Sequence, residues 1–199
     1  MVTAPASPPR QLLDRAARRE TILKGAAAAF AEQGYAGTSM EDVASAAGIT
    51  KLIVYRHFSS KEELYDAVLE EVSDRGREVF VAGLQAGRPG SGAVRALLTV
   101  AREDPASFTL LWRHAIREPQ FAEHAGAIRQ RGVDAAETLL ASAGVDAGPM
   151  RRWAAETIMS YLVSCVLHWL EEGREADDEQ FVERVTRSLP AMIRAWIGD

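Results

Sequence analysis

Polar and aromatic side chains follow one another at helical spacing between residues 38 and 61. Thr50, Lys51 and Tyr55 bring hydroxyl and ammonium groups that can donate to the edges of bases or to phosphates, and Leu52 can contact thymine methyl groups. The chain contains no G-x-S-x-G, H-E-x-x-H or paired-cysteine motif. These residue types therefore predict a binding surface for DNA rather than a catalytic centre.

Two short helices with a tight corner between them would position these side chains. Ser39 stands where a helix N-cap belongs, and Asp42 matches the acidic member of a capping box. Gly48 can adopt the left-handed conformation that often ends a helix, and Thr50 then caps the second helix. Two short helices joined by a glycine-containing turn predict a helix-turn-helix, whose second helix enters the DNA major groove.

The second short helix is expected to have an inner and an outer face. Val54 and Phe58 lie one turn apart and should face inward. At about 100° per residue, Leu52 and Arg56 then point outward, with Tyr55 beside them. The residues that we therefore assign to the groove are Thr50, Lys51, Leu52 and Tyr55.

The stretch TSMEDVASAAGITKLIVYRHFSSKEELYDAV resembles the N-terminal DNA-binding domain of the TetR family of transcriptional regulators. The shared features are the Thr-Ser cap, the Ala-Gly corner, the Tyr-x-His-Phe ending and the lysine after it, and the resemblance covers residues 15–72. It implies a homodimer that binds double-stranded operator DNA, most often as a repressor. It also implies that the DNA backbone is contacted by Thr38, Ser39, His57 and Lys61.

Several of these residues have a second interpretation that needs no DNA. Thr50 caps a helix in either case, His57 can be a buried residue of the head, and Arg56 can be solvated. Relatives often hold small residues where this chain has Leu52 and Ile53. The two bulky aliphatic side chains therefore predict a distinct operator.

Helical periodicity without sustained period-two alternation predicts an all-α fold for this chain of 199 residues. We expect a three-helix helix-turn-helix head, joined by a connecting helix to a helical C-terminal regulatory and dimerisation domain. The expected divisions are a flexible tail at 1–13, a DNA-binding domain at 14–60, a connecting helix at 61–80, and an effector-binding and dimerisation domain at 81–199.

Glycine and proline set the boundaries expected within the C-terminal part. Residues 82–92 are rich in glycine and are interpreted as a loop or a boundary, and Pro105 should open a helix that runs through Ile116. The other helices are expected at 14–33, 93–102, 120–141, 149–172 and 178–197.

The net charge of −5 is unevenly distributed. Residues 1–60 hold seven Lys or Arg against five Asp or Glu, a net charge of +2, and the rest of the chain carries −7. Because nucleic-acid affinity follows the local charge of the docking face, the overall acidity does not exclude DNA binding. A single cysteine, Cys165, and the absence of an apolar N-terminal signal or a long apolar run predict a cytoplasmic protein without a membrane segment.

The last two expected helices carry apolar residues on more than one face. Trp153, Tyr161 and Trp169 lie around the first, and Phe181 and Trp196 line the second. A helix that is apolar on several faces needs two partners. In the TetR family such helices pair with those of a second subunit, which predicts a homodimer through the last two helices. Burial within a larger monomer core would give the same pattern.

Aromatic residues in the C-terminal part could line a pocket for an unknown small-molecule effector, as the family resemblance implies. The candidates are Phe108, Trp112 and Trp169, which at helical spacing can equally be core residues. Cys165 and His168 stand three residues apart but lack a third ligand, so no metal site and no cofactor is predicted.

Three classes of function are compatible with these patterns. A ligand-responsive transcriptional regulator accounts for the helix-turn-helix residues, whereas an enzyme would lack a recognisable catalytic motif. A helical protein–protein interaction module would use the apolar terminal helices without sequence-specific DNA binding.

Overall fold

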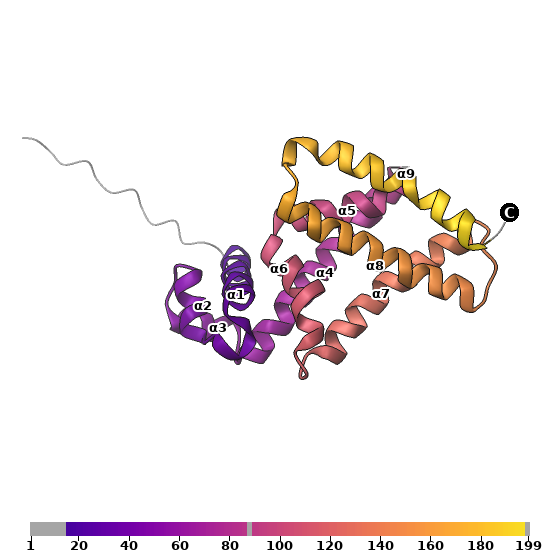
Figure 1. The fold of residues 1–199 in the computed structure, drawn as a ribbon. Helices are drawn as coiled ribbons and strands as arrows, with labels where there is room; N and C mark the ends of the chain where they lie inside the picture. The colour runs from indigo at the N-terminus through magenta and orange to yellow at the C-terminus, as the bar shows by residue number, and fades with distance from the viewer. Residues whose placement is uncertain (1–14, 87–88, 198–199) are drawn as a thin grey trace, which may run out of the picture.

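The computed structural model describes residues 15–86 and 89–197, and every regular element in those ranges is a helix (Figure 1). The all-α prediction is therefore confirmed, while the tail expected at residues 1–13 lies outside the described residues. The α-helices are α1 (Arg15–Gly37), α2 (Met40–Ala46), α3 (Lys51–His57), α4 (Lys61–Gln85), α5 (Pro89–Glu103), α6 (Pro105–Thr109), α7 (Ala122–Ser142), α8 (Pro149–Glu172) and α9 (Asp178–Ile197).

The head consists of α1, α2 and α3, and it packs against the first turns of α4 (Figure 1). One apolar stripe of α1 is buried there, with Ile22, Ala26 and Phe30 almost inaccessible to solvent. Gly34 interrupts the helical path with φ of 71°, a left-handed conformation that costs glycine little. This kink turns Tyr35 back into the head, so that its ring is buried.

A glycine on α1 lets the corner of the helix-turn-helix approach closely. A Cβ atom placed on Gly25 would lie 2.7 Å from the backbone nitrogen of Ala47 and 2.8 Å from its Cα. Ala47 is the residue at which α2 ends. Since such distances are shorter than van der Waals contact, α1 and the corner fit together only because residue 25 has no side chain.

Residues 82–92 contain a boundary between two helices, as one of the two expectations had it, but the described part of the stretch is mostly helical rather than a loop. α4 continues to Gln85, and α5 already begins at Pro89, whose fixed φ suits the first turn of a helix. The glycines of this stretch have a packing role, because a Cβ on Gly83 would lie 3.5 Å from the Cα of Gly92 on the adjacent helix. Small residues on both sides of this boundary let α4 and α5 approach each other closely.

The helix expected from Pro105 to Ile116 is divided into three. α6 is followed by a π-helical turn, Leu110–His114, and by a 3₁₀ turn, Ala115–Arg117. α7 then starts at Ala122, while α8 and α9 have the bounds that the sequence predicted. Pro190 is accommodated inside α9.

α8 and α9 run side by side at the end of the molecule away from the head (Figure 1). The ring of Trp169 stacks on Phe181 at 4.8 Å, and Trp153 meets Trp196 edge-on at 5.0 Å. No helix of the described residues is long and apolar enough to cross a membrane.

The contact at Gly25 yields a prediction about the head. Gly25→Ala should lower the free energy of unfolding by about 1–3 kcal/mol, because a methyl group has no space against Ala47. Gly76→Ala on α4 is the matched control: a Cβ there meets nothing within 4 Å, so the same change should stabilise the protein by about 0.5–1 kcal/mol. Denaturant unfolding of both variants measures the difference, and equal stabilisation by the two would contradict the packing argument.

Candidate nucleic-acid interface

The corner between α2 and α3 is fixed by local hydrogen bonds. Ser39 Oγ accepts from the backbone N–H of Asp42 at 3.2 Å, and the Asp42 carboxylate accepts from the backbone N–H of Ser39 at 2.8 Å. The expected capping box is therefore present. Gly48 has φ of 65°, as a left-handed helix end requires, and Thr50 precedes α3 in an extended conformation without a side-chain cap bond.

The two faces of α3 differ as predicted. Val54 is 0% exposed and Phe58 is buried, so this side of the helix is fixed to the head. Leu52 is 62% exposed and Tyr55 47% exposed, although both are large and largely apolar. Since exposed side chains of this kind on a short rigid helix have no partner within the described chain, they form a surface suited to insertion into a groove.

Lys51 has a partner that the sequence did not indicate. Its ammonium group lies 3.2 Å from the Glu41 carboxylate in the first turn of α2. Both side chains are largely exposed, so the pair contributes little to stability. Its effect is to hold the lysine beside the start of α3, from which it can exchange the carboxylate for a base or phosphate.

Two residues assigned to the DNA backbone also have structural roles. Thr38 is only 2% exposed, and its hydroxyl donates to the carbonyl oxygens of Ala29 at 3.1 Å and Gly34 at 2.8 Å. The ammonium of Lys61 donates to the carbonyls of Tyr35 and Thr38, both at 2.8 Å. These bonds tie the end of α1 to the start of α4.

Basic residues on α1 lie near the C-terminal end of α3. The pKa of His57 is lowered from its ordinary value, first by burial and then by the positive charges of Arg15, Arg18 and Arg19. His57 is half-buried and is therefore neutral at pH 7. Arg19 is paired with Glu71 at 2.6 Å, so its charge is partly offset. Arg15 and Arg18 place further positive charge on the same part of α1, close to α3.

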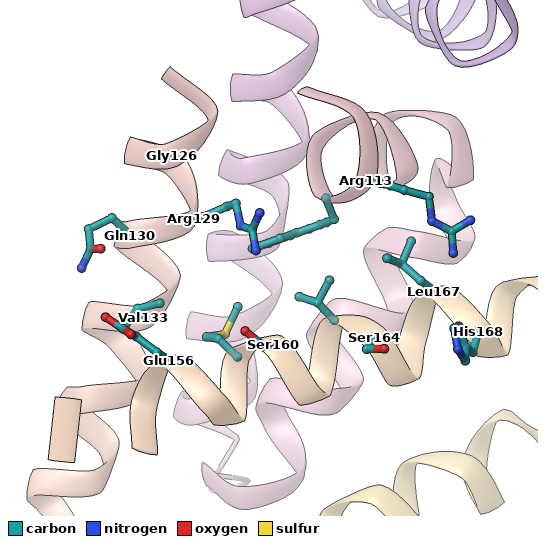
Figure 2. Close-up of a pocket in the computed structure, with 13 residues that line it drawn as sticks. Arg113, Gly126, Arg129, Gln130, Val133, Glu156, Ser160, Ser164, Leu167 and His168 are labelled. Atoms are coloured by element: carbon teal, nitrogen blue, oxygen red, sulfur yellow. The ribbon is translucent and has the colours of Figure 1, made fainter. Parts of the chain in front are cut away.

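The three aromatic effector candidates are not brought together. Trp112 lines a cavity of about 540 Å³ between α7, α8 and the π-helical turn (Figure 2). Phe108 is buried behind it, with the two ring centroids 6.2 Å apart. Trp169 lies elsewhere, donating from Nε1 to Asp178 at 2.6 Å while it stacks on Phe181.

A metal site is likewise not assembled in the described part of the chain. No group of three or more His, Cys, Asp or Glu side chains there could hold a metal ion. Burial raises the pKa of the Cys165 thiol, which keeps it protonated at neutral pH.

An aromatic cluster that sequence reasoning did not identify joins the head to the C-terminal part. Phe121, at the start of α7, stacks on Tyr65 of α4 at 4.1 Å and meets Tyr35 edge-on at 4.8 Å. Phe30 of α1 completes the cluster, 4.9 Å from Tyr65. The residues are far apart in sequence, so only their aromatic type was visible beforehand.

This geometry defines a helix-turn-helix protein of the DNA-binding class, and comparison with known proteins agrees. Residues 22–68 match the family model of the tetR family of bacterial regulatory proteins. Residues 91–197 match the model of the tetracyclin repressor-like C-terminal domain. The chain belongs to the TetR family and is a helix-turn-helix transcriptional regulator.

Individual relatives support this assignment. The chain is 30% identical over 181 residues to the transcriptional activator FasR of Mycolicibacterium smegmatis, covering 86% of this chain and 80% of that protein. It is 34% identical over 93 residues to the transcriptional repressor KstR2 of Rhodococcus jostii, a match that covers 45% of this chain and 44% of KstR2.

Solved structures share the fold. A TetR-like regulator from Rhodococcus sp. RHA1 superposes with a TM-score of 0.75 at 22% identity, covering 94% of this chain and all of the other. AibR, solved with isovaleryl coenzyme A and operator DNA, superposes with a TM-score of 0.63 at 22% identity, covering 85% of this chain and 96% of the AibR chain.

The capping box predicts a pH dependence of stability. Hydrogen bonds from the Ser39 side chain and backbone lower the pKa of Asp42, so folding favours its ionised form. Its contribution is present above the ordinary carboxyl pKa and is lost as pH falls through the depressed value. Wild type should therefore exceed Asp42→Asn in unfolding free energy at pH 7, and the gap should shrink by pH 3.

Denaturant titrations at the two pH values measure this gap. Ser45→Ala, at an exposed serine of the same helix outside the cap, should differ from wild type by the same amount at both values. A gap for Asp42→Asn that stays constant from pH 7 to pH 3 would be inconsistent with the capping role.

Proposed function

We propose that this protein is a ligand-responsive regulator that binds a palindromic operator as a homodimer and represses transcription. The observation that carries the proposal is the outer face of α3, where Leu52 and Tyr55 stand exposed beside Lys51 while Val54 anchors the inner face. A helix held in this way can enter the major groove with its N-terminal residues on the bases.

The contacts that we propose follow the geometry. The groove residues are Thr50, Lys51, Leu52 and Tyr55, and Ser39 and His57 flank them at the phosphates. Thr38 and Lys61 are left out of these contacts because they already bind backbone carbonyls. The bulk of Leu52 favours contact with thymine methyl groups. We further propose that the chain acts by binding rather than by catalysis, in the cytoplasm where operator DNA is found.

The proposed dimer uses the outer face of α8 and α9. Ser160 and Ser164 on α8, and Ala191 and Ala195 on α9, are exposed small residues that allow helices to approach closely. At the start of α8, Trp153 is 47% exposed, an apolar surface that a second subunit could cover. A two-fold axis through this face would present the same surface twice.

The proposed response to a ligand would be transmitted by α7. Its first residues contact α4 through Phe121 and through His124, whose Nε2 lies 3.2 Å from Glu70. Arg131, one to two turns further along, pairs with the same carboxylate at 2.9 Å. Since α4 continues into the head, a displacement of α7 would alter the separation of the two recognition helices in a dimer.

Two relatives inform the regulatory proposal. AibR binds both isovaleryl coenzyme A and operator DNA on the same fold, which supports an effector-responsive arrangement here. FasR is an activator and KstR2 a repressor. Repression is our proposal because it is the commonest mode of action in the TetR family.

The DNA-reading assignment can be tested by substitution. After an operator is selected from a random duplex pool, Lys51→Ala and Tyr55→Phe should each weaken binding by about 1–3 kcal/mol, because each removes a donor at the base edges. The thermal midpoint should hardly change, since both side chains are exposed. A selected site without two-fold symmetry, or operator affinity unaffected by both variants, would exclude the proposal.

The dimer face can be tested separately. Ser164→Glu should convert the dimer to a monomer, because two like charges would be buried opposite each other across the axis. Gln33→Glu adds the same charge at an exposed position of α1, remote from α8 and α9, and should leave the mass unchanged. Sedimentation equilibrium gives the masses, and a Ser164→Glu dimer of wild-type stability would place the interface elsewhere.

A further inference from the structure

The cavity between α7, α8 and the π-helical turn is lined by both apolar and polar side chains (Figure 2). The apolar ones are Val133, Met159, Val163 and Leu167 together with Trp112. A cavity of about 540 Å³ with this mixture lies within the range of small-molecule sites, which combine an apolar lining with a few polar anchors.

The polar groups are not equivalent, because most of the charges already have partners. Arg113 forms an ion pair with Glu171, and Glu156 pairs with Arg152 at 3.2 Å. Arg129 is different: it forms no ion pair with any carboxylate of the described residues. Its guanidinium lies over the Trp112 ring, 5.6 Å from the centroid, which orients it without neutralising its charge.

The irregular backbone before α7 sets the position of the Trp112 ring. Trp112 and Arg113 lie in the π-helical turn Leu110–His114, between α6 and a 3₁₀ turn. A π-turn rotates the side chains that follow it relative to a regular α-helix, and such turns occur often at functional sites. In Figure 2, Arg129 extends from α7 toward this segment, above the row formed by Ser160, Ser164 and His168 on α8.

We propose that this cavity binds a small amphiphilic anion, with its carboxylate or phosphate head on Arg129 and its apolar body against Met159, Val163 and Leu167. A planar guanidinium suits both heads through paired N–H donors. The inference rests on the proposed ligand-responsive function, of which it names the ligand class.

The site also occupies a position from which it can act on α4. Arg129 lies on the same helix as His124 and Arg131, which both contact Glu70 of α4. Ser160 and Ser164 belong at the same time to the face of α8 proposed for the dimer. A ligand here therefore touches the helix that leads to the head and the helix that leads to the partner.

The test uses the full-length protein without DNA and four eight-carbon probes that differ only in the head group. Isothermal titration should show octanoate and octyl phosphate binding at least about tenfold more tightly than octanol, and octylammonium binding most weakly, because only the first two can pair with a guanidinium. The tighter of the two anions identifies the preferred head. Equal affinity for all four probes would overturn the proposal.

Two pairs of variants identify the site. Arg129→Gln should reduce the preference for anions over octanol to less than threefold, whereas Arg77→Gln, at an exposed arginine of α4 outside the cavity, should keep it. A Cβ on Gly126 meets nothing within 4 Å, so Gly126→Leu should fill the cavity and abolish binding while Gly126→Ala retains it. Unchanged binding by both Arg129→Gln and Gly126→Leu would show that the anion binds elsewhere.

Different outcomes contradict the proposed ligand site and the proposed response of the regulator to a ligand. Binding lost in Arg129→Gln, together with an operator complex that octanoate and octyl phosphate leave intact, would support the site and contradict ligand responsiveness. Operator release by octanoate that persists in Arg129→Gln would support responsiveness and overturn this site.

Discussion

The packing of Tyr35, Tyr65 and Phe121 is the contact on which the arrangement of the whole molecule depends. These rings come from the end of α1, from α4 and from the start of α7, and they lie 4.1 to 5.3 Å apart between centroids. Aromatic pairs at such distances have preferred orientations, so the cluster sets angles as well as separations. Burial in it raises the pKa of Tyr35 to about 12, which keeps the phenol neutral. The head is thus fixed to the C-terminal part by rigid rings.

Around this cluster the polar side chains differ in how firmly they are held. Thr38 and Lys61 donate to backbone carbonyls and join α1 to α4, and Arg102 and Asp178 form a half-buried pair at 2.8 Å between α5 and α9. Lys51 and Arg129, which we propose for DNA and ligand contact, are held more loosely, one by an exposed carboxylate and the other by an aromatic ring. An exposed ion pair contributes little to stability, so Lys51 can change partner at small cost.

α7 connects these two kinds of site. Its N-terminal end contributes Phe121 to the aromatic cluster, its middle lines the cavity with Arg129 and Val133, and its contacts with Glu70 reach the connecting helix. The irregular turns before it, a π-turn and a 3₁₀ turn, allow its N-terminal end to be positioned independently of α6.

The sequence alone determined what depends on neighbouring residues: the all-α class, the capping box of Ser39 and Asp42, the inner and outer faces of α3, and the bounds of α8 and α9. These follow from hydrogen bonds and periodicities within a few turns of helix. At residues 82–92 it indicated a helix boundary, which is present, but it did not show that Gly83 and Gly92 allow α4 and α5 to touch. Tertiary structure alone decided that Gly25 must lack a side chain, that Thr38 is buried, and that Trp112 rather than Phe108 or Trp169 lines the cavity. Each of these depends on atoms brought together from distant parts of the chain, and no local pattern encodes which residues will meet.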